Sequence, residues 1–228
     1  MKAIVLAASL MLFASASHAD FIDTDWKVED DAKATLDTST GKEWLKFENT
    51  KGITYTELLS ELGVGGEFEG WRLPTVREVK DVVLQISLHT TLNSNINTLD
   101  YRESLGYMSS WAITWREVFG LSARPADRSL SYGVVQDTSG QFLMFGNNRI
   151  HANATQYFYA NWTKSSNYED NSQFSYYLVS NGGTTKSSID DPSINIAVRD
   201  ASSPLSASIM LLAGLFFVKR KKKSANPW

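Results

Sequence analysis

Apolar residues recur at helical spacing in two segments of the chain, each directly behind a threonine. Thr54 with Glu57, and Thr75 with Glu78, have the spacing of a capping box, which satisfies the free amides at a helix start. Apolar residues follow at intervals of three and four. They are Tyr55, Leu58, Leu59 and Leu62 in the first segment, and Val76, Val79, Val82 and Val83 in the second. The pattern predicts one helix that ends at the glycines of 63–66 and another that runs to about residue 88.

Short runs of aromatic and β-branched residues predict strands elsewhere. These runs lie at 35–36, 43–45, 107–115, 131–136, 141–145, 174–179 and 194–198, and the turn DTSG between two of them predicts a hairpin. Polar stretches predict loops at 89–106 and 147–171 and an exposed acidic lead-in at 20–34. Because helices and strands are segregated along the chain, we expect the α+β class. One domain over residues 35–200 would hold two helices and a mostly antiparallel β region.

The first 19 residues have the pattern of a secretory signal peptide. Lys2 precedes an apolar run over residues 3–14, and the small residues Ser17 and Ala19 precede Asp20. This order predicts a signal helix that is cleaved after Ala19. The domain that follows is therefore expected to be exported across the inner membrane.

The last 28 residues, 201–228, predict a second membrane-associated helix. Ser202, Ser203 and Pro204 lead into an apolar run over 205–218, which is followed by five consecutive cations at 219–223. This order predicts membrane contact through 205–223 with the basic tail on the cytoplasmic side. The 14-residue run is shorter than the roughly 20 residues that a bilayer needs. The segment is therefore either a short permanent anchor or a temporary one that a protease removes near Pro204.

Charge and cysteine content exclude several classes of protein. Six of the 22 Lys and Arg residues lie in the two ends, whereas all 25 acidic residues lie between them, so residues 20–203 carry 16 cations, 25 anions and a net charge of −9. Such a surface repels phosphate backbones, which excludes nucleic acid as the expected partner. The chain has no cysteine, which excludes disulfides, thiol catalysis, cysteine-bound zinc and covalent haem attachment.

One motif carries a family resemblance. The segment contains Trp71, Arg72, Leu73, Pro74 and Thr75, with Glu78 three residues on, and follows Gly41 and Trp44 in an upstream strand. Over residues 35–200, including a closing INIAVRD at 194–200, the chain resembles the bacterial Lcl C-terminal-domain-like family, a branch of the C-type-lectin-like domains. The tail resembles PEP-CTERM-like sorting signals cut by exosortase-type enzymes, although Ser-Ser-Pro at 202–204 replaces the usual Pro-Glu-Pro.

The same motif has a structural explanation. Pro74 fixes the backbone before the helix, Thr75 caps the helix and Glu78 closes the capping box. Strand alternation directs Trp71 and Leu73 into the core and Arg72 the other way, towards a carboxylate.

The resemblance places any ligand in the long-loop region of the second half. There, aromatic rings stand beside amide and carboxylate groups, an arrangement that suits a sugar. The candidate ligand-binding residues are Asn161, Trp162, Tyr168, Asp170 and Asn171. Oxygen ligands for calcium are available from Glu169, Asp170 and Asn171, and from Asp190 and Asp191. However, the Glu-Pro-Asn and Trp-Asn-Asp motifs of sugar-binding animal lectins are absent, so their calcium-dependent mode is not expected here.

Catalysis has no sequence signal. After signal cleavage His89 and His151 remain, and nothing around them predicts a metal site or a Ser-His-Asp triad. We therefore expect a non-enzymatic bacterial surface or envelope protein without a cofactor, which binds carbohydrate or another envelope component. The alternative is a structural component of a matrix or biofilm without a discrete small ligand.

Overall fold

A small antiparallel sheet combines the first three strands of the described chain with its last strand. The computed structural model describes residues 21–87, 101–107, 110–163 and 174–194. The sheet has the order β1 (Phe21–Thr24), β2 (Ala34–Asp37), β3 (Lys42–Leu45) and β9 (Val179–Ser180). Asp37 makes the β2–β3 turn, where its carboxylate accepts hydrogen bonds from Ser39 and Thr40. The predicted strands at 35–36 and 43–45 are confirmed as a pair.

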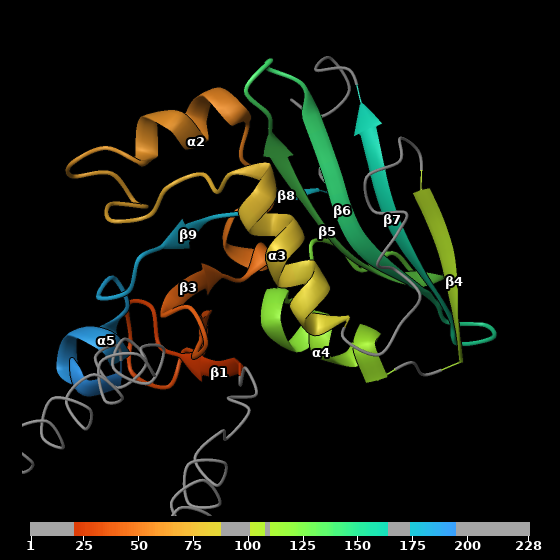
Figure 1. Ribbon diagram of the computed structural model, residues 1–228, viewed down its shortest axis with the longest axis horizontal. Helices are drawn as coiled ribbons and strands as arrows, with labels where there is room; N and C mark the ends of the chain where they lie inside the picture. Colours follow the sequence, from red (N-terminus) through yellow and green to blue (C-terminus); the bar gives the residue numbers. More distant parts are fainter. Residues whose placement is uncertain (1–20, 88–100, 108–109, 164–173, 195–228) are drawn as a thin grey trace, which may run out of the picture.

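A larger sheet forms the other half of the molecule (Figure 1). Its order is β4 (Tyr101–Tyr107), β7 (Thr155–Thr163), β6 (Phe142–Ile150), β5 (Arg128–Gln136) and β8 (Ser175–Tyr176). All neighbours are antiparallel except β5 and β8. The hairpin predicted around DTSG is confirmed as β5–β6, and the Asp137 carboxylate accepts hydrogen bonds from the turn.

One short segment joins the two sheets. Ser175 and Tyr176 extend the large sheet, and Val179 and Ser180, three residues later, extend the small one. Thr50, which follows the short helix η1 (Phe47–Asn49), exchanges two 3.0 Å hydrogen bonds with the backbone of Tyr176. The single strand predicted at 174–179 is therefore two strands of different sheets. Of the strand predicted at 194–198, residues 195–198 lie outside the described chain.

Four α-helices lie in the described residues: α2 (Tyr55–Glu61), α3 (Val76–Ile86), α4 (Ser110–Phe119) and α5 (Lys186–Asp190). The Thr54 and Thr75 side chains cap α2 and α3 as predicted, although of these two helices α3 alone has the complete capping box. Figure 1 shows α3 and α4 in the centre, and α4 contacts both β2–β3 and β5–β6. The α+β class is confirmed, but the expectation of two helices was too low.

The α4 helix corrects the prediction of a strand at 107–115. Its buried residues recur at helical spacing: Trp111, Ala112, Trp115, Val118 and Phe119. Aromatic and β-branched residues favour strands only where a sheet surface receives them. Here the sheets lie on two sides of the segment, and a helix presents its apolar residues to both.

The loops predicted at 89–106 and 147–171 are wrong in part for a related reason, while their residues 89–100 and 164–171 lie outside the described chain. Residues 101–107 form β4, and the polar stretch from residue 147 forms the end of β6 and all of β7. Asn147, Asn148 and Gln156 are buried in these strands although their side chains are polar. These strands therefore lack the alternation of apolar and polar residues from which a strand is predicted.

The acidic segment 20–34 is not simply an exposed lead-in. Its strand β1 pairs with β2, and buried Trp26 stacks on Phe68 at 5.7 Å between ring centroids. The Asp25 and Asp31 carboxylates accept hydrogen bonds from backbone amides of this segment, so its acidity stabilises a turn. Residues 27–30 are exposed, as predicted.

No helix in the described part of the chain is long and apolar enough to cross a membrane. The signal helix predicted at 1–19, with its cleavage site at Ala19, and the tail predicted at 201–228, with Pro204, lie outside the described residues.

The motif at residues 71–78 has the predicted structural role. Trp71 is buried and Leu73 packs at the edge of the same core. The Arg72 guanidinium makes two hydrogen bonds of 2.7 and 3.0 Å to the Glu78 carboxylate, which also accepts from the Thr75 amide at 2.8 Å. Lys42 adds an ion pair to Glu78 at 2.8 Å. The motif thus ties the start of α3 to β3.

Acid is expected to weaken this junction. The bond from Arg72, with help from Lys42 and the Thr75 amide, holds the pKa of Glu78 well below its ordinary value of 4.5. A depressed folded-state pKa stabilises the protein above the ordinary value, and this contribution is lost as pH falls. Denaturant unfolding from pH 7 to pH 3 should therefore show a loss of stability below about pH 4.5. In Glu78→Gln the stability at pH 7 should fall by about 1–2 kcal/mol, with a shallower acid dependence. An unchanged acid dependence in the variant would contradict this role.

Candidate functional site

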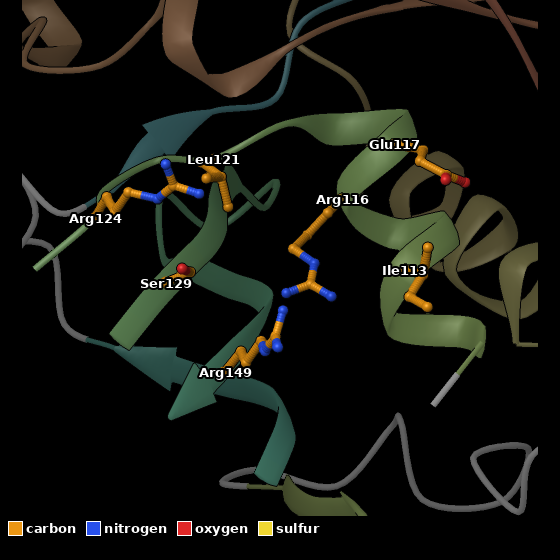
Figure 2. Close-up of a pocket in the computed structure, with 7 residues that line it drawn as sticks. All are labelled: Ile113, Arg116, Glu117, Leu121, Arg124, Ser129 and Arg149. Carbon is orange, nitrogen blue, oxygen red and sulfur yellow. The ribbon is translucent and has the colours of Figure 1, made fainter. Parts of the chain in front are cut away.

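A cavity of about 370 Å³ lies between α4 and the large sheet. We call it the arginine cavity. It is lined by Ile113, Arg116 and Glu117 of α4, Leu121 and Arg124 of the following loop, Ser129 of β5 and Arg149 of β6. Figure 2 shows the guanidinium groups of Arg116 and Arg149 pointing towards one another. Its size is at the lower end of the roughly 300–1,000 Å³ typical of small-molecule sites.

The packing of α4 brings these arginines together. Trp115 is buried in the core below α4, and its indole Nε1 donates a 3.1 Å hydrogen bond to the Ser131 carbonyl of β5. Arg116 is the next residue on the helix. On the sheet, Ser129 and Arg149 are direct cross-strand partners, so their side chains project from the same face. The helix and the hairpin thus hold Arg116 against Arg149 from two directions.

The three arginines of the cavity lack ion-pair partners among the described residues. In the described residues Arg72, Arg77 and Arg128 form ion pairs, but Arg116, Arg124 and Arg149 form none. The Arg149 Nε atom is buried and has no acceptor in the described part of the chain. Burial, followed by the charge of Arg149, lowers the pKa of Arg116, and Glu117 only partly offsets this. The cavity therefore concentrates positive charge inside a domain whose net charge is negative.

A polar row continues from the cavity across the sheet. Gln156 of β7 is the cross-strand partner of Arg149 and is fully buried. Within the described chain, neither its amide oxygen nor its amide nitrogen has a hydrogen-bond partner, and the Asn147 Oδ1 atom also lacks one. Buried polar atoms usually find partners, and each exception has a cost of about 1–3 kcal/mol. Arg149 thus has neighbours on β6 and β7 whose polar groups also lack partners in the described chain.

Ser129 has a histidine partner at the rim of the cavity. Its Oγ atom lies 2.8 Å from Nε2 of His151, and Nδ1 of the same ring lies 3.2 Å from the Ala126 carbonyl. A carbonyl can only accept, so Nδ1 carries the hydrogen of the neutral ring. Nε2 is then the acceptor, and the Ser129 hydroxyl donates to it. Ser129 is only 6% exposed, whereas His151 lies at the surface.

None of the residues selected from the sequence lines this cavity. Asn161 and Trp162 lie at the end of β7, opposite Met144 and Leu143 of β6. Tyr168, Glu169, Asp170 and Asn171 lie outside the described residues. Their roles in sugar or calcium binding stay predictions.

The other calcium candidates have local partners. Asp190 pairs with Lys186, and Asp191 accepts hydrogen bonds from Ser193. The described part of the chain contains no group of three or more His, Asp or Glu residues that could hold a metal ion.

Sequence reasoning missed the residues of the arginine cavity. Arg116, Arg124 and Arg149 share no spacing or motif, and Ser129 and His151 are 22 positions apart. Only the fold shows that these arginines form no ion pair within the described residues.

Searches against protein-family models, curated proteins and solved structures gave no match. The interpretation of the site therefore rests on the residues of this chain.

Proposed function

We propose that this chain is an exported envelope or surface protein whose domain binds an anionic envelope component through the arginine cavity. The observation that carries this proposal is the convergence of Arg116 and Arg149, which form no ion pair with any described residue. Export is inferred from the signal-like residues 1–19 and from the apolar and basic segment 205–223. The resemblance to lectin-like domains favours carbohydrate as the carrier of the anionic group.

The energetics support a ligand. Two guanidinium groups that face one another in a partly buried cavity repel, and neither recovers its lost hydration from a carboxylate. An oxyanion such as a carboxylate, sulfate or phosphate would accept hydrogen bonds from both, since guanidinium groups bind such anions in a planar, bidentate manner. Ile113 and Leu121 supply apolar surface beside this charge. One acidic sugar unit combines an oxyanion with an apolar ring face and matches this lining.

Loss of either facing arginine is expected to abolish most of the binding. Arg116→Gln and Arg149→Gln should each weaken binding of the full-length protein to an acidic polysaccharide, polygalacturonate, by about 10- to 100-fold. Calorimetry with the polymer, with neutral dextran and with inorganic phosphate measures the effect. Arg77→Gln is the matched control: it removes the same charge from a side chain that is 91% exposed on α3.

Arg116→Gln and Arg149→Gln should remain folded, because in the described residues neither arginine forms an ion pair, and Arg77→Gln loses only an exposed pair with Asp81. Thermal unfolding checks this point. Equal binding by Arg77→Gln and Arg116→Gln would contradict the proposal. If neither acidic polymer nor phosphate binds the wild type, the alternative of a structural matrix component without a small ligand is favoured.

A further inference from the structure

We propose that Ser129 and His151 form a nucleophile–base pair that hydrolyses carboxylic esters of an anionic substrate held in the arginine cavity. The substrate class rests on the proposed function, because the arginines select the anion. The catalytic pair itself rests on separate observations.

The first observation is the hydrogen-bond geometry. A serine hydroxyl becomes a nucleophile when a base lies within hydrogen-bond reach and a third group orients that base. Here the Ser129 Oγ to His151 Nε2 distance is 2.8 Å, and the Ala126 carbonyl orients the ring through Nδ1. The carbonyl takes the position that a carboxylate has in a Ser-His-Asp triad. The nearby Asp127 carboxylate pairs with Arg128.

The second observation is the location of the pair. Ser129 lines the arginine cavity, and its cross-strand partner Arg149 has a buried Nε–H that finds no acceptor among the described residues. Ester cleavage develops negative charge on the carbonyl oxygen, and fixed donors aimed at that charge accelerate the reaction. The Arg149 guanidinium has several N–H donors, so it can direct one at this oxygen while it shares the anionic group of the substrate with Arg116. His151 lies at the surface, where water can reach it.

The reaction balances without a cofactor. The Ser129 Oγ attacks the ester carbonyl carbon while its proton passes to His151 Nε2. The bond from this carbon to the alcohol oxygen breaks, and His151 returns the proton to the departing alcohol. Water then attacks the acyl-serine, loses a proton to His151 and releases the carboxylic acid. The same proton returns to Ser129, so one ester and one water give one acid and one alcohol.

The first test is hydrolysis by the full-length protein of two aryl esters, 4-nitrophenyl acetate and the 4-nitrophenyl monoester of succinic acid, which keeps a free carboxylate. We expect turnover of both, with a higher kcat/KM for the anionic ester. Ser129→Ala and His151→Ala should each reduce turnover about 100-fold or more. Ser60→Ala is the control, because Ser60 is an exposed serine on α2. Equal rates in wild type and Ser129→Ala would overturn the proposal.

The second test reads the pair directly. A fluorophosphonate probe should label Ser129, as located by peptide mass spectrometry, and imidazole in solution should restore labelling of His151→Ala. The chain has no cysteine, so Ser129→Cys gives a single thiol, whose alkylation by iodoacetamide near pH 7 should be faster with His151 than without it. No probe on Ser129 and no effect of His151 on the thiol would overturn the proposal.

These outcomes are separable from those of the proposed function. If Ser129→Ala still binds polygalacturonate but the wild type hydrolyses neither ester, the proposal of anion binding stands and that of the catalytic pair is contradicted. If the wild type hydrolyses 4-nitrophenyl acetate and shows no preference for the anionic ester, the catalytic pair is supported and the proposed anionic substrate class is contradicted.

Discussion

Replacing Glu43 with alanine is expected to lower the free energy of unfolding by about 3–5 kcal/mol. The Glu43 side chain is 0% exposed. Its carboxylate accepts hydrogen bonds from the Thr185 hydroxyl at 2.5 Å, the Ser180 hydroxyl at 2.9 Å and the Thr184 amide at 3.2 Å. Alanine would leave these donors unpaired in the interior and open a cavity at the β3–β9 junction. A typical domain is stable by only about 5–15 kcal/mol, so this loss is large.

The measurement is equilibrium unfolding in urea, followed by tryptophan fluorescence. Glu57→Ala is the matched control, since it removes the same carboxylate from an exposed position on α2. Its effect should stay below about 1 kcal/mol. Glu43→Gln should fall between the two, because the amide keeps one acceptor oxygen but points its NH₂ group at donors. A loss below about 1 kcal/mol in Glu43→Ala would show that Glu43 does not hold the C-terminal segment in place.

Replacing Trp115 with alanine is expected to cost about 3–5 kcal/mol of stability. Trp115 is fully buried between the sheets, and its ring lies 4.7 Å from Phe119, 5.5 Å from Trp111 and 5.8 Å from Phe158, measured between centroids. The indole also donates to the Ser131 carbonyl. Alanine removes the ring contacts and this bond together, and the aromatic side chains around it cannot close the space without strain.

The conservative variant separates the two contributions. Trp115→Phe keeps most of the ring packing and should cost about 1–2 kcal/mol, mainly from the unpaired Ser131 carbonyl and the smaller ring. Urea unfolding gives both values. Binding of polygalacturonate should also weaken in Trp115→Ala under conditions where it is folded, because Arg116 is the next residue on α4. Equal stability of the alanine and phenylalanine variants would contradict the packing role.

Local signals predicted the first third of the described fold well. The Thr54 and Thr75 caps fixed the starts of α2 and α3, because a threonine side chain satisfies amides within its own helix turn. The Arg72 guanidinium donates a hydrogen bond to the carboxylate of Glu78, which is only six positions away in the sequence. Both interactions join residues that are close in the sequence, so the residue pattern was enough to predict the caps and that Arg72 points towards a carboxylate.

The second half was harder to predict because its burial is set by distant segments. Residues 110–119 form a helix because two sheets enclose them, and Asn147 and Gln156 lie in strands because neighbouring strands pair with their backbone. The aromatic composition and the polar composition of these segments indicated a strand and a loop, respectively. Tertiary contacts instead made the first segment a helix and the second a pair of strands.

The sequence by itself determined the α+β class, the capped helices, the β5–β6 hairpin and the acidity of the central domain, because these follow from neighbouring residues and from composition. It could not determine the arginine cavity. A guanidinium group is available to bind an anionic ligand when no acidic side chain of the protein pairs with it. Whether one does depends on which side chains α4, β5 and β6 bring together. The tertiary structure alone placed Arg116 against Arg149 and His151 beside Ser129.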